Sequence, residues 1–187
     1  MDLIIFAHPD NQKSHNAAIL RYVTSCLNRE FRSFEIIDLY ADGFDPVLRL
    51  TREDQKKTLL VEKYQKLVAK ADRLIFISPV WWYNTPAILK GFIDHVFNSG
   101  LAHNFVSNST NSTLHKKLTG KTAVIINTYG RTKQEATDHG SPLELVLDKA
   151  VLEFCGVKVT SRVEWFEVKG LGILNPEIAK KIEKALG

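Results

Sequence analysis

Three segments of this sequence carry residue types that could bind a flat anionic ligand. The first, residues 8–16, reads His-Pro-Asp-Asn-Gln-Lys-Ser-His-Asn and leads into an amphipathic stretch. A helix N-terminus offers unpaired backbone N–H groups and the positive end of a dipole to an anion. The side chains that we expect to supplement these groups around a phosphate are those of His8, Lys13, Ser14, His15 and Asn16. Ser14 could also act only as the N-cap of the helix.

The second segment, residues 79–86, reads Pro-Val-Trp-Trp-Tyr-Asn-Thr-Pro. Consecutive aromatic side chains make a platform for a planar ring system, because offset stacking adds about 0.5–1.5 kcal/mol beyond burial. A hydrophobic plug or a dimer interface would use the same residues. The third segment, residues 128–140, begins Thr-Tyr-Gly-Arg and contains His139.

The elements that must position these segments alternate along the chain. Candidate strands cover residues 3–7, 34–39, 73–78, 122–127 and 157–165. The first, third and fourth are apolar without alternation, as expected for parallel strands covered on both faces. Helices between them predict an α/β fold with a doubly wound parallel sheet and helices on both faces. Ligands of such sheets bind beyond the carboxyl ends of the strands, and all three polar segments follow such ends.

The other elements are predicted from local signals. The last strand alternates, which places Val157, Val159, Val163 and Trp165 on one face. We expect one helix to begin at Thr51 and another to run from Ser141-Pro142 to Gly156. Residues 98–120 are predicted to be an irregular insert that forms a rim over the site, with mobility at 107–113.

Length and composition exclude several classes. The 187 residues predict a single domain, and 44% hydrophobic with 25% charged residues is typical of a folded globular chain. The net charge of +4 is spread without a basic stripe, so we expect no nucleic-acid partner. No apolar run approaches the roughly 20 residues that cross a bilayer, so we predict no membrane insertion and a cytoplasmic location. No metal site is expected.

The chain resembles the flavodoxin-like NAD(P)H:quinone oxidoreductases over residues 1 to about 160. The resemblance rests on Pro79-x-x-Trp-Tyr-x-x-Pro-Ala-Ile-Leu-Lys-Gly-x-x-Asp-x-Val-Phe97, preceded by Ala7-His8 and Ser14-x-Asn16. The family includes animal quinone reductases, bacterial modulator-of-drug-activity quinone reductases and ancillary subunits of glutathione-gated potassium efflux systems. It implies a flavodoxin-like sheet of order 2-1-3-4-5, FAD or FMN as cofactor, NAD(P)H as co-substrate, a quinone-like acceptor and a homodimer.

The resemblance also implies roles for individual residues. His8, Ser14 and Asn16 would hold the flavin phosphates and ribityl chain, while the ring would lie between two segments: Pro79, Val80, Trp81, Trp82 and Tyr83 on one side, and Thr128, Tyr129 and Gly130 on the other. Tyr129, Arg131 and His139 are the expected catalytic residues. On chemical grounds, Arg131 would stabilise charge on the reduced ring or would be a solvated loop arginine, and His139 would donate a proton to the acceptor. His103 and Phe105 match the segment that lines the acceptor pocket.

Two other functions remain open at this stage. A regulatory flavoprotein that docks on a potassium-efflux transporter would carry the same flavin. A one-electron carrier of the flavodoxin type would be acidic and would have a phosphate loop rich in Thr and Gly, whereas this chain is basic and has residues 8–16 there.

Overall fold

The computed structural model describes residues 1–48, 59–107, 112–138 and 144–187. Five parallel strands form the central sheet in the order β2-β1-β3-β6-β7, which confirms the predicted topology. The strands are β1 (Asp2–Phe6), β2 (Phe34–Asp38), β3 (Arg73–Pro79), β6 (Thr122–Thr128) and β7 (Lys158–Trp165). Nearly every residue of β1, β3 and β6 is buried, as their unbroken apolar sequences predict.

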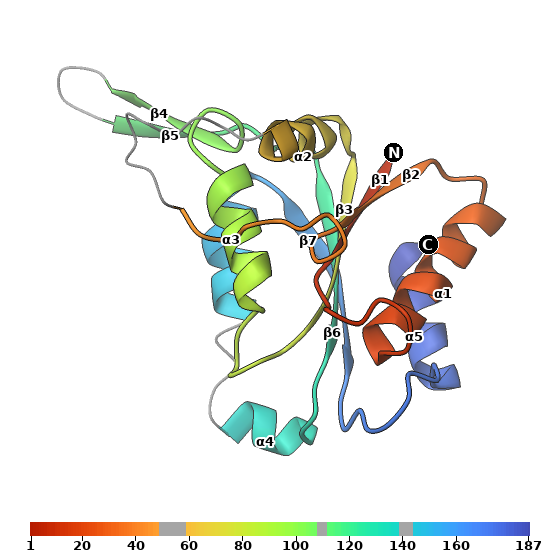
Figure 1. Cartoon of the computed structure of the whole chain (residues 1–187). Helices are drawn as coiled ribbons and strands as arrows, with labels where there is room; N and C mark the ends of the chain where they lie inside the picture. The colour runs from red at the N-terminus through yellow and green to blue at the C-terminus, as the bar shows by residue number, and fades with distance from the viewer. Residues whose placement is uncertain (49–58, 108–111, 139–143) are drawn as a thin grey trace.

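Helices cover both faces of this sheet (Figure 1). Helices α1 (His15–Arg29) and α5 (Pro176–Leu186) pack on one face, where Val23, Leu27 and Ile182 join a buried apolar cluster. On the other face lie α2 (Leu59–Lys70), α3 (Ala87–Val96) and the π-helix η1 (Glu144–Glu153). The short helix α4 (Lys133–Asp138) lies beyond the carboxyl end of β6.

The structure differs from the sequence expectations in the connections. The insert predicted to be irregular contains an antiparallel hairpin, β4 (His103–Ser107) and β5 (Ser112–Lys116). The predicted mobility at 107–113 falls partly on residues 108–111, which lie outside the described residues, as do the expected helix starts at Thr51 and at Ser141-Pro142. Helix α4 was not predicted.

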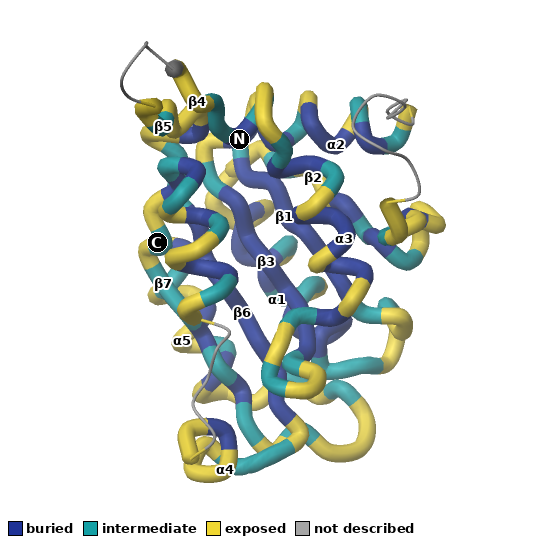
Figure 2. Tube along the Cα trace, turned by 90° about the vertical axis from the view of Figure 1, so that its left-hand side faces the viewer, coloured by how far each residue is buried: buried dark blue, intermediate teal, exposed yellow. Residues whose placement is uncertain are grey.

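The expectation that the four apolar residues in and just before β7 share one face is wrong. Val157 and Val159 pack with the cluster on the α2 and α3 side, whereas Val163 and Trp165 pack with α1 and α5. The pairing with β6 shifts register after Val159, so one residue is left over. An extra residue turns every later side chain to the opposite face. The edge strand therefore contributes side chains to both cores, and Figure 2 shows its position at the border of the sheet.

None of the helices formed by the described residues combines the length and apolar character that a bilayer crossing requires.

Candidate functional site

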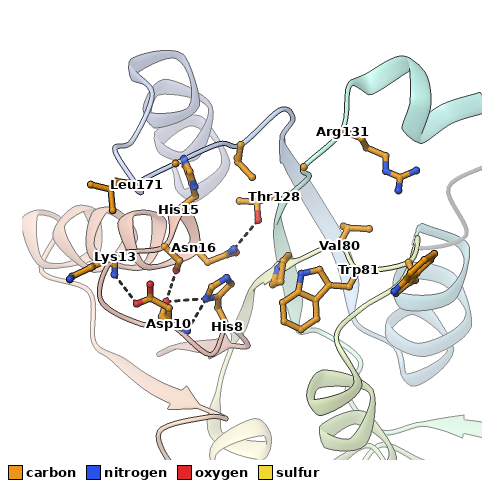
Figure 3. Close-up of a pocket in the computed structure, with 16 residues that line it drawn as sticks. His8, Asp10, Lys13, His15, Asn16, Val80, Trp81, Thr128, Arg131 and Leu171 are labelled. Carbon is orange, nitrogen blue, oxygen red and sulfur yellow. Dashed lines mark hydrogen bonds between the residues drawn. The ribbon is translucent and has the colours of Figure 1, made fainter.

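A cleft of about 750 Å³ lies at the carboxyl ends of β1, β3 and β6, which we call the carboxyl-end cleft (Figure 3). It brings together the three segments singled out in the sequence and a fourth, residues 168–171. The predicted site residues that line it are His8, Lys13, Ser14, His15, Asn16, Pro79, Val80, Trp81, Trp82, Thr128, Gly130 and Arg131. Asp10, Val168, Gly170 and Leu171 complete the lining.

The N-terminus of α1 forms one end of this cleft. Ser14 is the N-cap, and its Oγ accepts a hydrogen bond of 3.0 Å from the Ala17 N–H. Asp10 shapes the preceding loop, because its Oδ1 accepts bonds of 2.9 Å from the N–H groups of Gln12 and Lys13. Ser14 therefore caps the helix, which is one of the two roles expected for it, and it also lines the cleft. The open end of α1 gives this part of the cleft a preference for anions.

Asn16 ties the helix to the sheet and leaves one atom unpaired. Its Nδ2 donates a 2.8 Å hydrogen bond to Thr128 Oγ1, and the residue is buried. Its Oδ1 is buried without a partner in the described part of the chain. A buried acceptor left unpaired costs about 1–3 kcal/mol, so a ligand hydroxyl or N–H placed here gains that stabilisation.

Two histidines at this end of the cleft are held towards the neutral form. Burial lowers the pKa of His8, and a hydrogen bond between its Nδ1 and the Asp10 carbonyl partly opposes that shift. Burial also lowers the pKa of His15, with the nearby His8 as a second cause. The His15 ring contacts Trp165 edge to face at 4.8 Å.

The lowered pKa values of His8 and His15 predict how the stability of the protein changes with pH. Because the folded pKa values lie below the ordinary 6.5, the unfolded chain binds protons that the folded chain does not. The contribution of these two histidines to the free energy of unfolding is therefore complete above pH 6.5. It is lost as the pH falls from 6.5 towards the folded pKa values. Urea unfolding at about pH 7.5 and about pH 5.5 should therefore show a larger loss of stability for the native chain than for the His8→Gln/His15→Gln variant. An equal loss in both proteins would contradict the assignment.

A tight turn carries the tryptophans on the opposite side of the cleft. Trp81 and Asn84 exchange two backbone hydrogen bonds of 3.0 Å, and the two residues between them, Trp82 and Tyr83, have φ values of 51° and 61°. Residues other than glycine rarely adopt this left-handed backbone conformation, which costs roughly 1–2 kcal/mol for each such residue. Trp82 is 93% exposed and Trp81 is 42% exposed, so both indoles are available to a ligand.

The strain in this turn can be measured. Trp82→Gly should be more stable than Trp82→Ala by about 1 kcal/mol, because both variants lose the indole and only glycine adopts a positive φ freely. The measurement is the difference in urea unfolding free energy between the two variants. If the alanine variant proves as stable as the glycine variant, the turn is not strained as described.

Arg131 joins this turn to the segment after β6. Its guanidinium lies 4.2 Å from the centre of the Tyr83 ring and donates a hydrogen bond to the Tyr83 hydroxyl. Arg131 lines the cleft, whereas Tyr83 does not. Tyr83 therefore acts on the cleft through Arg131, by holding a fixed positive charge at its rim.

Besides Tyr83, three of the predicted residues do not line the cleft. The Tyr129 side chain is buried beneath it, stacks on Phe166 at 4.5 Å and donates a 2.8 Å hydrogen bond to Glu164. Burial and the Glu164 bond raise the Tyr129 pKa, which opposes a role as an acid or base. His103 and Phe105 lie on β4, at the end of the molecule opposite α4 (Figure 1). His139 lies outside the described residues.

Sequence reasoning missed the wall formed by residues 168–171. The chain returns from β7 across the start of α1, where the Gly172 N–H donates a 2.8 Å bond to the Lys13 carbonyl. A Cβ on Gly172 would lie 2.1 Å from the Ser14 carbonyl oxygen, so only glycine allows this approach. The spacing of Gly170 and Gly172 after the last strand was the available signal.

Comparisons with known proteins agree with this geometry. Residues 3–187 match a family model described as a flavodoxin-like fold. Ribosyldihydronicotinamide dehydrogenase (quinone) from Homo sapiens is 30% identical over 97% of this chain and 84% of that protein. The structure of Smu.1420 from Streptococcus mutans aligns with a TM-score of 0.77 and 37% identity, covering 98% of this chain and 95% of that one. An azoreductase from Bacillus anthracis, solved with FMN, shares the fold with a TM-score of 0.75 at 20% identity, over 98% and 96% of the two chains.

Proposed function

Because the chain belongs to the family of flavodoxin-like NAD(P)H:quinone oxidoreductases, we propose that it is a flavin-dependent enzyme that moves a hydride from NAD(P)H to a quinone-like acceptor. One observation carries the proposal. The exposed indoles of residues 81 and 82 and the N-terminus of α1, whose free N–H groups favour an anion, line the same cleft. A flavin nucleotide has both a planar ring, which matches the indoles, and a phosphate, which matches the N-terminus of α1.

The residues present fit FMN or FAD. The phosphate end would meet the first N–H groups of α1, and the unpaired Oδ1 of Asn16 would accept a bond from a ribityl hydroxyl. The ring would lie between the Trp81 turn and residues 128–131. A bound flavin supplies the centre that takes up two electrons as a hydride. The cleft's volume and mixed lining are consistent with either cofactor.

The chain's own groups would stabilise negative charge at the ring edge. The Tyr129 N–H is already donated to the Trp165 carbonyl at 2.8 Å, so it does not serve this purpose. The Gly130 N–H makes no hydrogen bond in the described part of the chain and lines the cleft. The Gly130 N–H and the Arg131 guanidinium would both face the negative charge that develops on the ring. The side chains of Val80, Trp81 and Leu171 would exclude water from the ring. The proposed proton donor is His139.

The test begins with the cofactor. The purified protein is incubated separately with FMN and FAD, its visible spectrum is recorded, and oxidation of NADH and NADPH by 1,4-benzoquinone is followed. The released flavin is then identified by mass spectrometry. We expect one flavin per chain and turnover that depends on it. Failure to retain either flavin, or retention without any oxidation of reduced nicotinamide, overturns the proposal.

A matched pair of variants tests the position of the ring. Trp81→Ala should weaken flavin binding by about tenfold, because one stacking partner and its burial are lost. Phe31→Ala removes an aromatic side chain that is 97% exposed and outside the lining of the cleft, and should leave flavin affinity unchanged. Equal affinities in the two variants would remove Trp81 from the binding site.

We also propose that the protein is a homodimer. Phe105 and Val106 on β4 are 58% and 48% exposed, and the hairpin projects from the body of the protein (Figure 1). In a dimer this hairpin would cover the partner's cleft, which would bring His103 and Phe105 to the acceptor. Light scattering should give twice the mass of the chain, and Phe105→Ser/Val106→Ser should give a monomer, unlike the control Phe31→Ser. A monomeric native protein would contradict the arrangement.

A further inference from the structure

A second hollow runs along the outer edge of β7, on the side of that strand that no other strand of the sheet occupies. We call it the edge groove. It has a volume of about 430 Å³, and its lining includes Lys133 from α4, Arg162, Glu164 and Phe166 from the edge, and Lys181 and Lys184 from α5. Figure 2 shows β7 at the border of the sheet beside α5, with α4 beyond its end. None of these residues lines the carboxyl-end cleft.

The charges of the edge groove are unbalanced. Arg162 donates to Asp148 at 2.5 Å and to Asn127 Oδ1 at 2.6 Å, so its charge is compensated. The Glu164 carboxylate accepts a hydrogen bond from Tyr129. The ammonium groups of the three lysines have no ion pair or hydrogen bond in the described part of the chain. Three uncompensated cations therefore face one carboxylate, which favours an acidic ligand.

The backbone of β7 adds donors and acceptors to these charges. The Trp165 carbonyl accepts the Tyr129 N–H, so it points towards β6. Because the main-chain groups of a strand alternate in direction, those of Glu164 and Arg162 point outwards into the edge groove. Each of these two residues thus presents an N–H and a C=O in the spacing that a neighbouring strand requires.

We propose that the edge groove binds an extended acidic peptide segment as a sixth strand beside β7. The outward backbone groups would pair with the peptide main chain, and its acidic side chains would lie against Lys133, Lys181 and Lys184. The lining spans residues 161–166, a length of about 20 Å at roughly 3.3 Å per residue. A small anion would use the lysines and the two N–H groups, and would leave the outward carbonyls unpaired.

The proposal does not depend on the flavin, and its test can be run with and without cofactor. The ¹⁵N-labelled full chain is titrated with acetyl-(Glu-Val)₃-amide, with acetyl-(Lys-Val)₃-amide and with inorganic pyrophosphate. We expect only the acidic peptide to shift the amide signals of Arg162 and Glu164 and to slow their hydrogen exchange. Lys184→Glu should weaken that binding by about fivefold, because a local attraction becomes a repulsion.

The matched control is Lys180→Glu, one position before Lys181 on α5 and outside the lining of the edge groove. It carries the same change in net charge and should leave the affinity nearly unchanged. Equal weakening by both variants would mean that the attraction is non-specific. Binding of pyrophosphate without the acidic peptide would show a small-anion site. If neither ligand binds, the lysines serve only to protect an exposed strand edge from association. Each of these three results overturns the proposal.

Discussion

Replacing Gly172 with alanine is expected to open the carboxyl-end cleft and to weaken flavin binding by about tenfold or more, since the added methyl group overpacks a rigid contact. A Cβ at this position would lie 2.1 Å from the Ser14 carbonyl oxygen, 2.3 Å from its carbon and 2.6 Å from the His15 nitrogen. All three are backbone atoms of the α1 N-terminus, so the loop must move away. Gly170 and Leu171, which line the cleft, would move with it.

The same substitution should lower the free energy of unfolding by about 1–3 kcal/mol. Gly187→Ala is the matched control, because its Cβ would meet only the Glu183 carbonyl oxygen at an ordinary 3.6 Å. Flavin affinity is measured by titration and stability by urea unfolding. Wild-type flavin affinity in the Gly172→Ala protein would show that the wall formed by residues 168–171 is not part of the binding site, whatever the change in stability.

Replacing Asp2 with alanine is expected to give the largest loss of stability, about 3–5 kcal/mol, because it leaves buried positive charge uncompensated. Asp2 is 1% exposed and accepts hydrogen bonds of 2.8 Å from Arg32 Nε and Arg73 Nε. The Arg73 side chain is only 11% exposed, so water cannot replace the lost carboxylate fully. This cluster lies at the end of β1 opposite to the cleft. It links the first residue of β1 to the first residue of β3 and to the segment just before β2.

An exposed pair between an aspartate and a lysine provides the comparison. Lys90 and Asp94 pair across one turn of α3 at 2.6 Å, with side chains 53% and 38% exposed. Asp94→Ala should therefore lower the free energy of unfolding by no more than about 0.5 kcal/mol. Urea unfolding of both variants gives the two values. If Asp2→Ala costs as little as Asp94→Ala, the buried cluster contributes no more than a surface pair.

The apolar pattern was sufficient to predict the five strands of the central sheet, and the resemblance to the flavodoxin-like quinone oxidoreductases supplied their order. The unbroken apolar runs of β1, β3 and β6 indicate burial on both faces, and right-handed crossovers leave few topologies. Local patterns did not reveal the register shift that sends Val157 and Trp165 to opposite faces, because a single bulged residue is set by pairing with β6. The hairpin β4–β5 was missed because its strands are mostly polar and exposed.

The candidate site was predictable where it depends on loops after strands. Residues of the first two segments lie together because parallel strands end at one edge. The position of Tyr129 was not predictable from spacing alone, since one residue of offset decides whether a side chain faces the cleft or Phe166. The contribution of residues 168–171 depends on the close approach of Gly172 to Ser14, a contact between parts of the chain far apart in sequence.

The placement of the tryptophans gives the protein an internal optical probe. The chain has three, and Trp81 and Trp82 line the cleft while Trp165 contacts His15 at its edge. Intrinsic emission should therefore come entirely from this one end of the molecule. An absorbing dye seated there would quench all three indoles by energy transfer, whereas a peptide in the edge groove, which spans residues 161–166, would affect Trp165 alone. Fluorescence titration can thus distinguish occupation of the two sites without any added label.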